Sequence, residues 1–143
     1  MAGLKIDDAF PRVISAKTHG VIDYIHAGTN ILVGALFSRR NGRAGAAAYA
    51  LGGFVLANAL MTDYPLGVFR LYSFKVHGML DYGLAATCAV LPNVLGIEDT
   101  PEAGYFRAQG AGETVIAGIT DYDDDSGSRR RQRMERFRIR RAA

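Results

Sequence analysis

Two octapeptides in this chain carry histidine and aspartate at the same spacing. One reads KTHGVIDY and contains His19 and Asp23, and the other reads KVHGMLDY and contains His77 and Asp81. A spacing of four residues puts both side chains on one face of a helix. Imidazole and carboxylate are ligands for zinc and iron, and two histidines on separate helices could also hold a haem. The octapeptides therefore predict a site for a metal, a haem or a small polar ligand.

The octapeptides are 58 residues apart, and other matches share this offset. Thr62-Asp63-Tyr64 recurs as Thr120-Asp121-Tyr122, and Gly52 falls on Gly110. Separate matches at one offset, without a gap, are typical of an internal repeat. The sequence therefore predicts a tandem duplication in which each unit contributes two helices.

The aspartates of the shorter motif, Asp63 and Asp121, are further ligand candidates. We expect each to close the second helix of its unit, at the membrane face where the octapeptides begin. A carboxylate is unfavourable at the negative end of a helix dipole. A cationic partner, His19 or His77, is therefore expected beside them.

A second group of polar residues is predicted deeper in the helices: His26, Asn30, Asn58 and Glu113. His26 is also a candidate metal or ligand residue, together with the two octapeptide histidines and the four aspartates. His26 lies nine positions into its helix, roughly 13 Å, and Glu113 lies roughly 12 Å from the same face. A His26–Glu113 pair is therefore geometrically possible. Ionisable groups inside a membrane are candidates for proton or ion handling, and the alternative is a neutral pair that serves packing.

The octapeptides have a structural interpretation as well. His19, Asp23, His77 and Asp81 would then form hydrogen bonds between helices and fix how the two units pack. Both interpretations stay open at this level. The single cysteine, Cys88, is more typical of a small buried apolar residue than of a ligand.

The residues around these motifs predict four helices, at 17–38, 44–63, 75–96 and 103–122. Residues 44–61 are uncharged and, at 18 residues, about long enough to span a membrane. The expected fold class is all-α, a four-helix transmembrane bundle from a tandem duplication of a two-helix unit. The expected organisation is an N-terminal segment at 1–16, units at 17–64 and 75–122 with a linker at 65–74, and an acidic, then arginine-rich tail at 123–143.

Charge predicts the orientation in the membrane. An even number of spans per unit puts both octapeptides on one side, together with most of the lysines and the eight arginines of the tail, Arg129–Arg141. By the positive-inside rule, both termini lie in the cytoplasm and the protein in the inner membrane. The expected partners are the bilayer, anionic lipid headgroups at the tail arginines and further membrane subunits. Met134, Phe137 and Ile139 among these arginines favour lipid over nucleic acid.

The linker region carries a resemblance. The run Thr62-Asp-Tyr-Pro-Leu-Gly67, followed by Phe74-Lys-Val-His-Gly78, is similar to a junction in small bacterial membrane proteins with SPW-type repeats. Leu91-Pro92-Asn93-Val-Leu-Gly96 keeps the proline and the later glycine, although the name-giving Ser-Pro-Trp is not intact. The chain thus resembles this family over about residues 17–122. The resemblance implies a pair of transmembrane helices per repeat and no established activity.

Several enzyme classes lack support in the sequence. GxGxxG, P-loop, GxSxG, HExxH and CxxC motifs are all absent, so nucleotide-driven, hydrolytic and thiol-redox enzymes are not indicated. The leading hypothesis is a small membrane protein that binds a ligand through its His/Asp cluster. The alternative is a non-catalytic accessory or assembly subunit of a membrane complex. A soluble di-metal four-helix protein is a third, but Leu84 stands where the second unit would need a histidine.

Overall fold

The computed structural model describes residues 11–124, Gln132 and Ile139. This part contains four helices, α1 (Ala16–Phe37), α2 (Gly42–Met61), α3 (Phe74–Leu95) and α4 (Pro101–Gly118), with short strands β1 (Thr62–Asp63) and β2 (Tyr72–Ser73) between α2 and α3. The prediction of a helical protein with four helices is confirmed. The first ten residues and the tail arginines, with their predicted lipid contact, lie outside the described residues.

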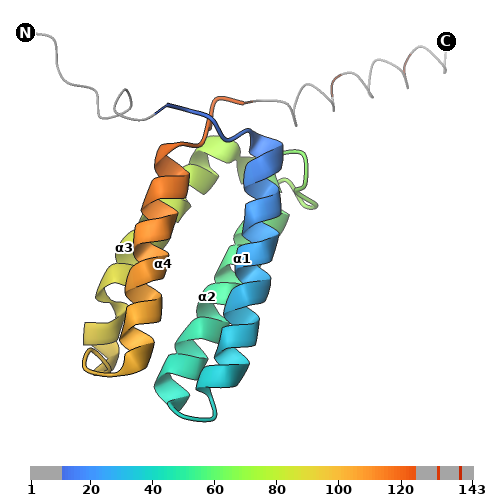
Figure 1. The fold of residues 1–143 in the computed structure, drawn as a ribbon. Helices are drawn as coiled ribbons and strands as arrows, with labels where there is room; N and C mark the ends of the chain where they lie inside the picture. The colour runs from blue at the N-terminus through green and yellow to red at the C-terminus, as the bar shows by residue number, and fades with distance from the viewer. Residues whose placement is uncertain (1–10, 125–131, 133–138, 140–143) are drawn as a thin grey trace, which may run out of the picture.

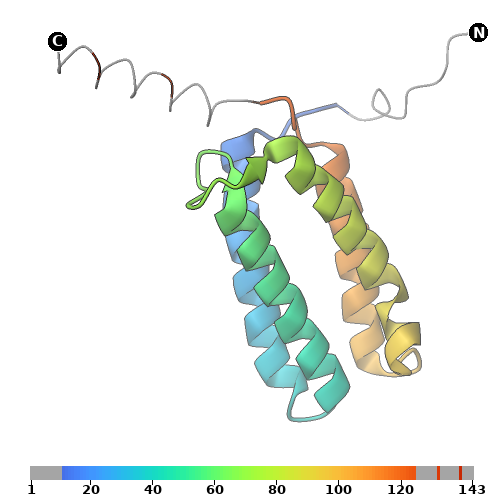
Figure 2. The same cartoon turned by 180° about the vertical axis from the view of Figure 1, so that it is seen from behind.

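The helices form two antiparallel hairpins (Figures 1 and 2). α1 packs along α2, and α3 packs along α4. The hairpins meet at the end where β1 and β2 lead from α2 into α3, and α2 and α3 diverge from there (Figure 2). Contacts between the hairpins nevertheless reach the far end, where Arg43 Nη1 donates to the carbonyl of Leu95 at 3.1 Å and the ring of Phe37 meets that of Phe106.

Three of the four helices, α1, α2 and α3, begin where the sequence provides a side-chain cap. The hydroxyls of Ser15 and Ser73 accept the backbone N–H of the residue three positions on, and the Asn41 side chain does the same at α2. The predicted bounds of the first and third helices are therefore correct to within one residue. Gly96, at φ 63°, ends α3 in the left-handed conformation that glycine adopts without strain.

The second and fourth helices end earlier than predicted. α2 stops at Met61 and α4 at Gly118, because the chain then turns into short parallel pairings. Asp63 therefore lies in β1 and Asp121 in the segment after α4, so the prediction that these aspartates close helices was wrong.

The parallel pairings were not predicted. β1 pairs with β2 through Thr62 and Tyr72, and an isolated bridge joins Ile14 to Thr120. Residues 14 and 72 differ by 58, as do 62 and 120, so the same kind of pairing occurs at both junctions. Strands of two residues have no detectable period in a sequence. The bridge brings the segment before α1 beside the segment after α4.

Two glycines of the octapeptides allow aromatic rings to approach the helices. A Cβ on Gly20 would lie 2.9 Å from Cε2 of Tyr64, and a Cβ on Gly78 would lie 2.8 Å from Cε1 of Tyr122. These separations are shorter than van der Waals contact. In each octapeptide, the glycine that follows the histidine therefore leaves room for the tyrosine of a Thr-Asp-Tyr motif.

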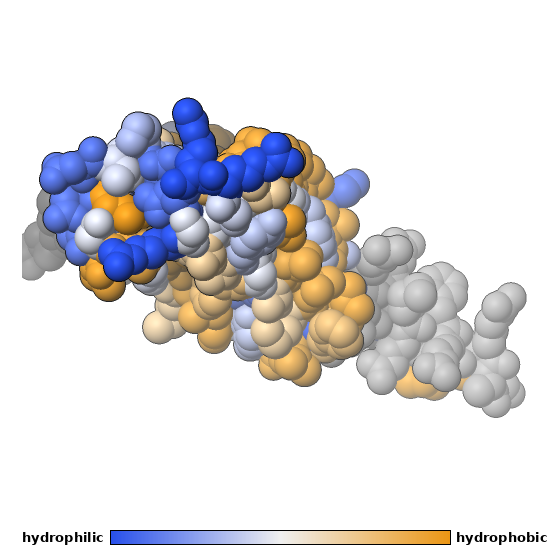
Figure 3. Space-filling model, turned by 90° about the horizontal axis from the view of Figure 1, so that it is seen from below, coloured by the Kyte–Doolittle hydropathy of each residue, from blue (hydrophilic) through white to orange (hydrophobic). Residues whose placement is uncertain are grey.

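Much of the outer surface of the helices is apolar. Among the described residues, α1, α2 and α3 are long and apolar enough to cross a membrane. Most of each of these three spans lies on the outside of the protein rather than in its interior. Figure 3, viewed from the end opposite the strands, shows hydrophilic residues gathered at that end and apolar residues along the sides. A soluble bundle would carry polar residues on these faces. The large exposed apolar side chains include Val21, Ile25, Leu32, Phe54, Met79 and Val94.

We predict that Gly20→Ala and Gly78→Ala each destabilise the fold by about 1–3 kcal/mol, the usual cost of overpacking. Gly28 is the matched control, because nothing lies within 4 Å of a Cβ added there. Gly28→Ala should leave stability unchanged or raise it slightly. Thermal unfolding of the detergent-solubilised protein measures the difference, and equal midpoints for the three variants would contradict this packing.

Candidate functional site

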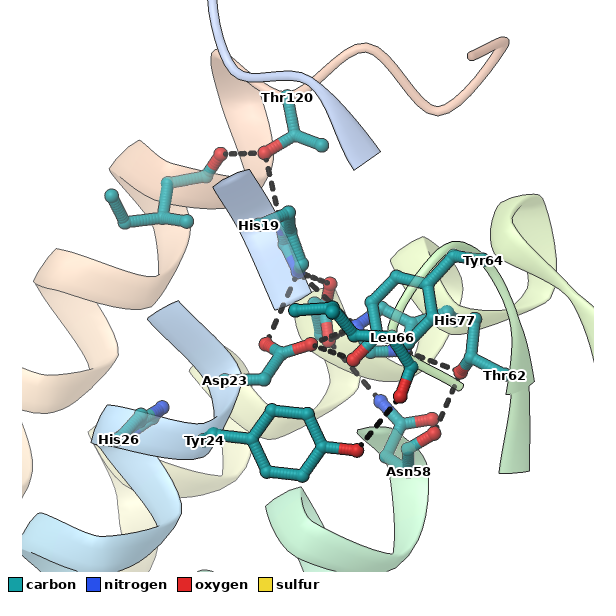
Figure 4. A network of polar contacts seen from close by, with 12 residues as sticks. His19, Asp23, Tyr24, His26, Asn58, Thr62, Tyr64, Leu66, His77 and Thr120 are labelled. Carbon is teal, nitrogen blue, oxygen red and sulfur yellow. Dashed lines mark hydrogen bonds and ion pairs between the residues drawn. The ribbon is translucent and has the colours of Figure 1, made fainter. Parts of the chain in front are cut away.

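Four side chains meet where the two hairpins join. His19 and Asp23 come from α1, and His77 and Asp81 come from α3 (Figure 4). The Nε2 atoms of the two histidines are 3.1 Å apart, and none of the four residues is more than 4% exposed. The predicted approach of the two octapeptide histidines is therefore confirmed. We call these four residues the His/Asp centre.

Each carboxylate of the centre touches both imidazoles. Asp23 lies 3.3 Å from His19 Nε2 through Oδ1 and 3.4 Å from His77 Nε2 through Oδ2. Asp81 lies 3.2 Å from His19 Nε2 through Oδ2 and 3.2 Å from His77 Nε2 through Oδ1. The two ring nitrogens and the two carboxylates thus converge on one small buried volume.

Two threonines fix the orientation of the imidazoles. Thr120 Oγ1 lies 2.9 Å from His19 Nδ1, and Thr62 Oγ1 lies 2.7 Å from His77 Nδ1. Each hydroxyl already donates its only hydrogen to a helix carbonyl four residues earlier, at 2.6 Å. The hydroxyl must therefore accept from the ring, and Nδ1 of both histidines carries a proton. Each threonine belongs to one hairpin and its histidine to the other.

Two tyrosines hold the carboxylates. Tyr64 Oη donates to Asp23 Oδ2 at 2.9 Å, and Tyr122 Oη donates to Asp81 Oδ2 at 2.7 Å. Burial raises the pKa of both phenols well above the ordinary value, and the charge of the neighbouring aspartate adds to the shift. Both phenols therefore stay protonated and act as donors. Each tyrosine bonds the aspartate of its own hairpin.

The centre is not fully symmetric. Asn58 Nδ2 donates to Asp81 Oδ1 at 3.3 Å, and its own Oδ1 accepts from Tyr72 Oη at 2.6 Å. The position 58 residues after Asn58 is Ile116, which provides no such donor. Asn58, predicted only as an intramembrane polar residue, therefore belongs to the surroundings of the centre.

Three predicted ligand candidates lie outside the centre: His26, which bonds Gln109 instead, Asp63 and Asp121. Asp63 Oδ1 is 3.8 Å from Arg70 Nη1, and Asp121 Oδ1 is 4.0 Å from Arg12 Nη1. The expectation that His19 or His77 would be their cationic partner was wrong, because both nitrogens of each ring are committed to threonine and carboxylate groups. Asp63 and Asp121 fix the segments that follow α2 and α4 rather than entering the centre.

The deeper polar residues form a separate network between α1 and α4. His26 Nδ1 lies 3.4 Å from Glu113 Oε2, as the matching depths predicted. His26 Nε2 also bonds Gln109 Oε1 at 3.0 Å, and Gln109 and Tyr105 both donate to Asn30 Oδ1. Figure 4 shows His26 directed away from the centre. The chain thus holds two distinct groups of buried polar residues.

Sequence reasoning missed the residues that support the centre. By residue type, Tyr64 and Tyr122 fit an aromatic belt at a membrane interface, but Tyr64 is fully buried and both bond the centre. Thr62 and Thr120 were not singled out. The available signal was the shared offset, because a T-D-Y motif that recurs in step with the octapeptides suggests that the two motifs meet.

The donor set suits a cation. Among the described residues, His19, Asp23 and His77 offer ligand atoms within 4.8 Å of one another, and Asp81 adds a second carboxylate.

Comparisons of this chain with family models, curated proteins and solved structures gave no match. The arguments about function therefore rest on the geometry of the centre.

We predict that Thr120→Val destabilises the protein by about 1–3 kcal/mol, because it leaves the buried Nδ1–H of His19 without an acceptor. Valine keeps the volume of the side chain. Thr87 is the control, since its exposed hydroxyl bonds only its own helix, at the Gly83 carbonyl. Equal stability of Thr120→Val and Thr87→Val in thermal unfolding would contradict the assigned orientation of the ring.

Proposed function

We propose that this chain is a small integral membrane protein that binds one divalent transition-metal ion at the His/Asp centre. The ion would join the two hairpins, with His19 and Asp23 as ligands from one hairpin and His77 and Asp81 as ligands from the other. Imidazole with carboxylate is a ligand set for zinc and other first-row metals.

The orientation of the imidazoles carries this proposal. Because both Nδ1 atoms hold protons, deprotonation of both Nε2 atoms would leave their lone pairs facing each other at 3.1 Å, beside two carboxylates. Buried acceptors and charges need a positive partner. One divalent cation balances the two carboxylates. The separations of 3.1–3.4 Å among His19 Nε2, His77 Nε2 and the carboxylate of Asp23 are near the separation of about 3.3 Å between ligands 2.0–2.1 Å from tetrahedral zinc.

The other predicted cofactor fits less well. A haem held by His19 and His77 would have to fit its iron and its macrocycle between the two Nε2 atoms. These nitrogens are only 3.1 Å apart, and Asp23 and Asp81 occupy the space around them. The geometry favours a bare metal ion.

The alternative is an accessory or assembly protein in which the centre only holds the hairpins together. A protonated histidine between the carboxylates would provide the positive charge without a metal. In support, every buried polar side-chain atom among the described residues has a partner. Whether the purified protein binds a metal ion distinguishes the proposed metal-binding function from this accessory role.

We also infer that the two hairpins arose by duplication. Positions 58 residues apart have matching roles in the tyrosine–aspartate bonds, the threonine–histidine bonds and the strand pairings. The ion pairs Arg12–Asp121 and Arg70–Asp63 match in the same way.

The membership in the SPW-repeat family stays a prediction, as does binding of anionic headgroups by the tail.

We predict that the purified protein binds one Zn²⁺ or Co²⁺ per chain, and that His19→Ala and His77→Ala each abolish binding. His26→Ala removes the remaining histidine of the chain and should retain the ion, because His26 lies outside the centre. Metal analysis after dialysis against the ion measures this. Absence of metal from the folded wild type would reject the proposal in favour of the accessory role.

We further predict a membrane topology with both termini in the cytoplasm. A reporter fused after Ala142 should be active in the cytoplasm, and one inserted after Asn41 should be active in the periplasm. The exposed apolar faces of α1, α2 and α3 support membrane insertion. Recovery of the untagged protein from the soluble fraction would overturn this prediction.

A further inference from the structure

A buried metal centre needs a path by which the ion arrives and leaves. The centre is closed by two tyrosines, Tyr64 beside Gly20 and Tyr122 beside Gly78. Because each tyrosine also bonds one aspartate of the centre, an ion that passes on either side must displace a tyrosine. The surroundings of the two tyrosines differ.

The Tyr64 side is sealed. Tyr64 is fully buried, and Leu66 packs against the same glycine, with Cδ1 only 3.1 Å from where a Cβ of Gly20 would lie. Tyr24 Oη fixes this loop by donating to the carbonyl of Leu66 at 3.0 Å. The loop is also anchored at both ends, by α2 and by α3, and its ends pair as β1 and β2.

The Tyr122 side opens into a cleft of about 510 Å³. Its inner wall contains Gly78, Thr120 and Tyr122, and the last two of these bond His19 and Asp81 directly. The side chains of Thr120 and Tyr122, which bond the centre, therefore also separate the centre from the cleft. Arg12, Lys75 and Asp123 also line this cleft.

Charged side chains fasten the segment that carries Tyr122. Asp123 Oδ1 lies 2.7 Å from Lys75 Nζ, and Asp123 Oδ2 accepts from Arg12 Nη1 at 2.9 Å. All three side chains are well exposed. Exposed ion pairs are weak and are screened by salt. Residues on both sides of Tyr122 and Asp123 are held more firmly, because Asp121 N bonds the Ile14 carbonyl at 2.9 Å and Asp124 Oδ2 accepts from Ala16 N at 2.9 Å. The turn at Tyr122 and Asp123, which only the exposed ion pairs fasten, is therefore easier to release than the buried loop on the Tyr64 side.

We propose that the metal ion enters and leaves the centre through the cleft on the Tyr122 side, and that the turn at Tyr122 and Asp123 acts as a gate that the ion pairs of Asp123 hold closed. This inference rests on the proposed metal site. Opening the gate removes the Tyr122 hydroxyl from Asp81 and joins the centre to the cleft. Tyr64 keeps its bond to Asp23, so one side of the centre stays intact during exchange.

The test uses the full-length protein loaded with Co²⁺ in detergent and mixed with excess chelator. Loss of the cobalt absorption then measures release. Asp123→Asn and Lys75→Met should release the ion up to about fivefold faster than wild type, the factor that corresponds to the loss of an exposed ion pair. Higher ionic strength should accelerate release from wild type and have little effect on Asp123→Asn.

The chain offers a matched control for each variant. Asp63 pairs with Arg70 and does not line the cleft, and Lys17 is the exposed counterpart of Lys75. Asp63→Asn and Lys17→Met should release the ion at the rate of wild type. Stoichiometric binding with equal rates in all four variants, or faster release only in the controls, would overturn the gate and leave the metal site standing. Failure of wild type to bind Co²⁺ would overturn both.

Discussion

The contact between the imidazoles of His19 and His77 is the interaction on which the arrangement of the hairpins depends. Two carboxylates lie against these rings in a volume from which water is largely excluded. Polar groups in such surroundings are costly unless every donor and acceptor is paired. The supporting residues follow from this requirement. Threonines orient the rings, tyrosines hold the carboxylates, and the short strand pairings bring both residue types over the helix ends.

The same requirement accounts for the small residues in the helices. Gly20 and Gly78 leave room for the rings of Tyr64 and Tyr122, and a methyl group at either position would collide with the ring. Away from the centre, a hydrophobic cluster that includes Leu51, Leu84 and Phe106 packs the helices together, and the polar centre adds directional contacts where the hairpins join. Interhelical hydrogen bonds and close backbone approach are the interactions that position helices in a membrane, where lipid is as apolar as leucine.

The sequence predicted the four helices, the four residues of the centre and the His26–Glu113 pair, because helical spacing and a common offset relate these positions directly. The ends of the second and fourth helices were harder to predict from the sequence. A residue such as Asp63 follows an apolar run without a break, and only pairing with a distant segment takes it out of the helix. Residue type alone would place Tyr64 and Tyr122 in an interface belt, because tyrosine is common there. Their true position depends on tertiary contacts with Asp23 and Asp81, which no local pattern encodes.

The exchange of threonines between hairpins bears on how such a fold could begin. Each hairpin provides its own histidine, aspartate and tyrosine but takes the threonine that orients its histidine from the other hairpin. Before the proposed duplication, a single hairpin would obtain this threonine by pairing with a second copy of itself. The linker between the hairpins makes that association intramolecular. It also lets the halves diverge, because a residue such as Asn58 or His26 would occur twice in a homodimer and occurs once here.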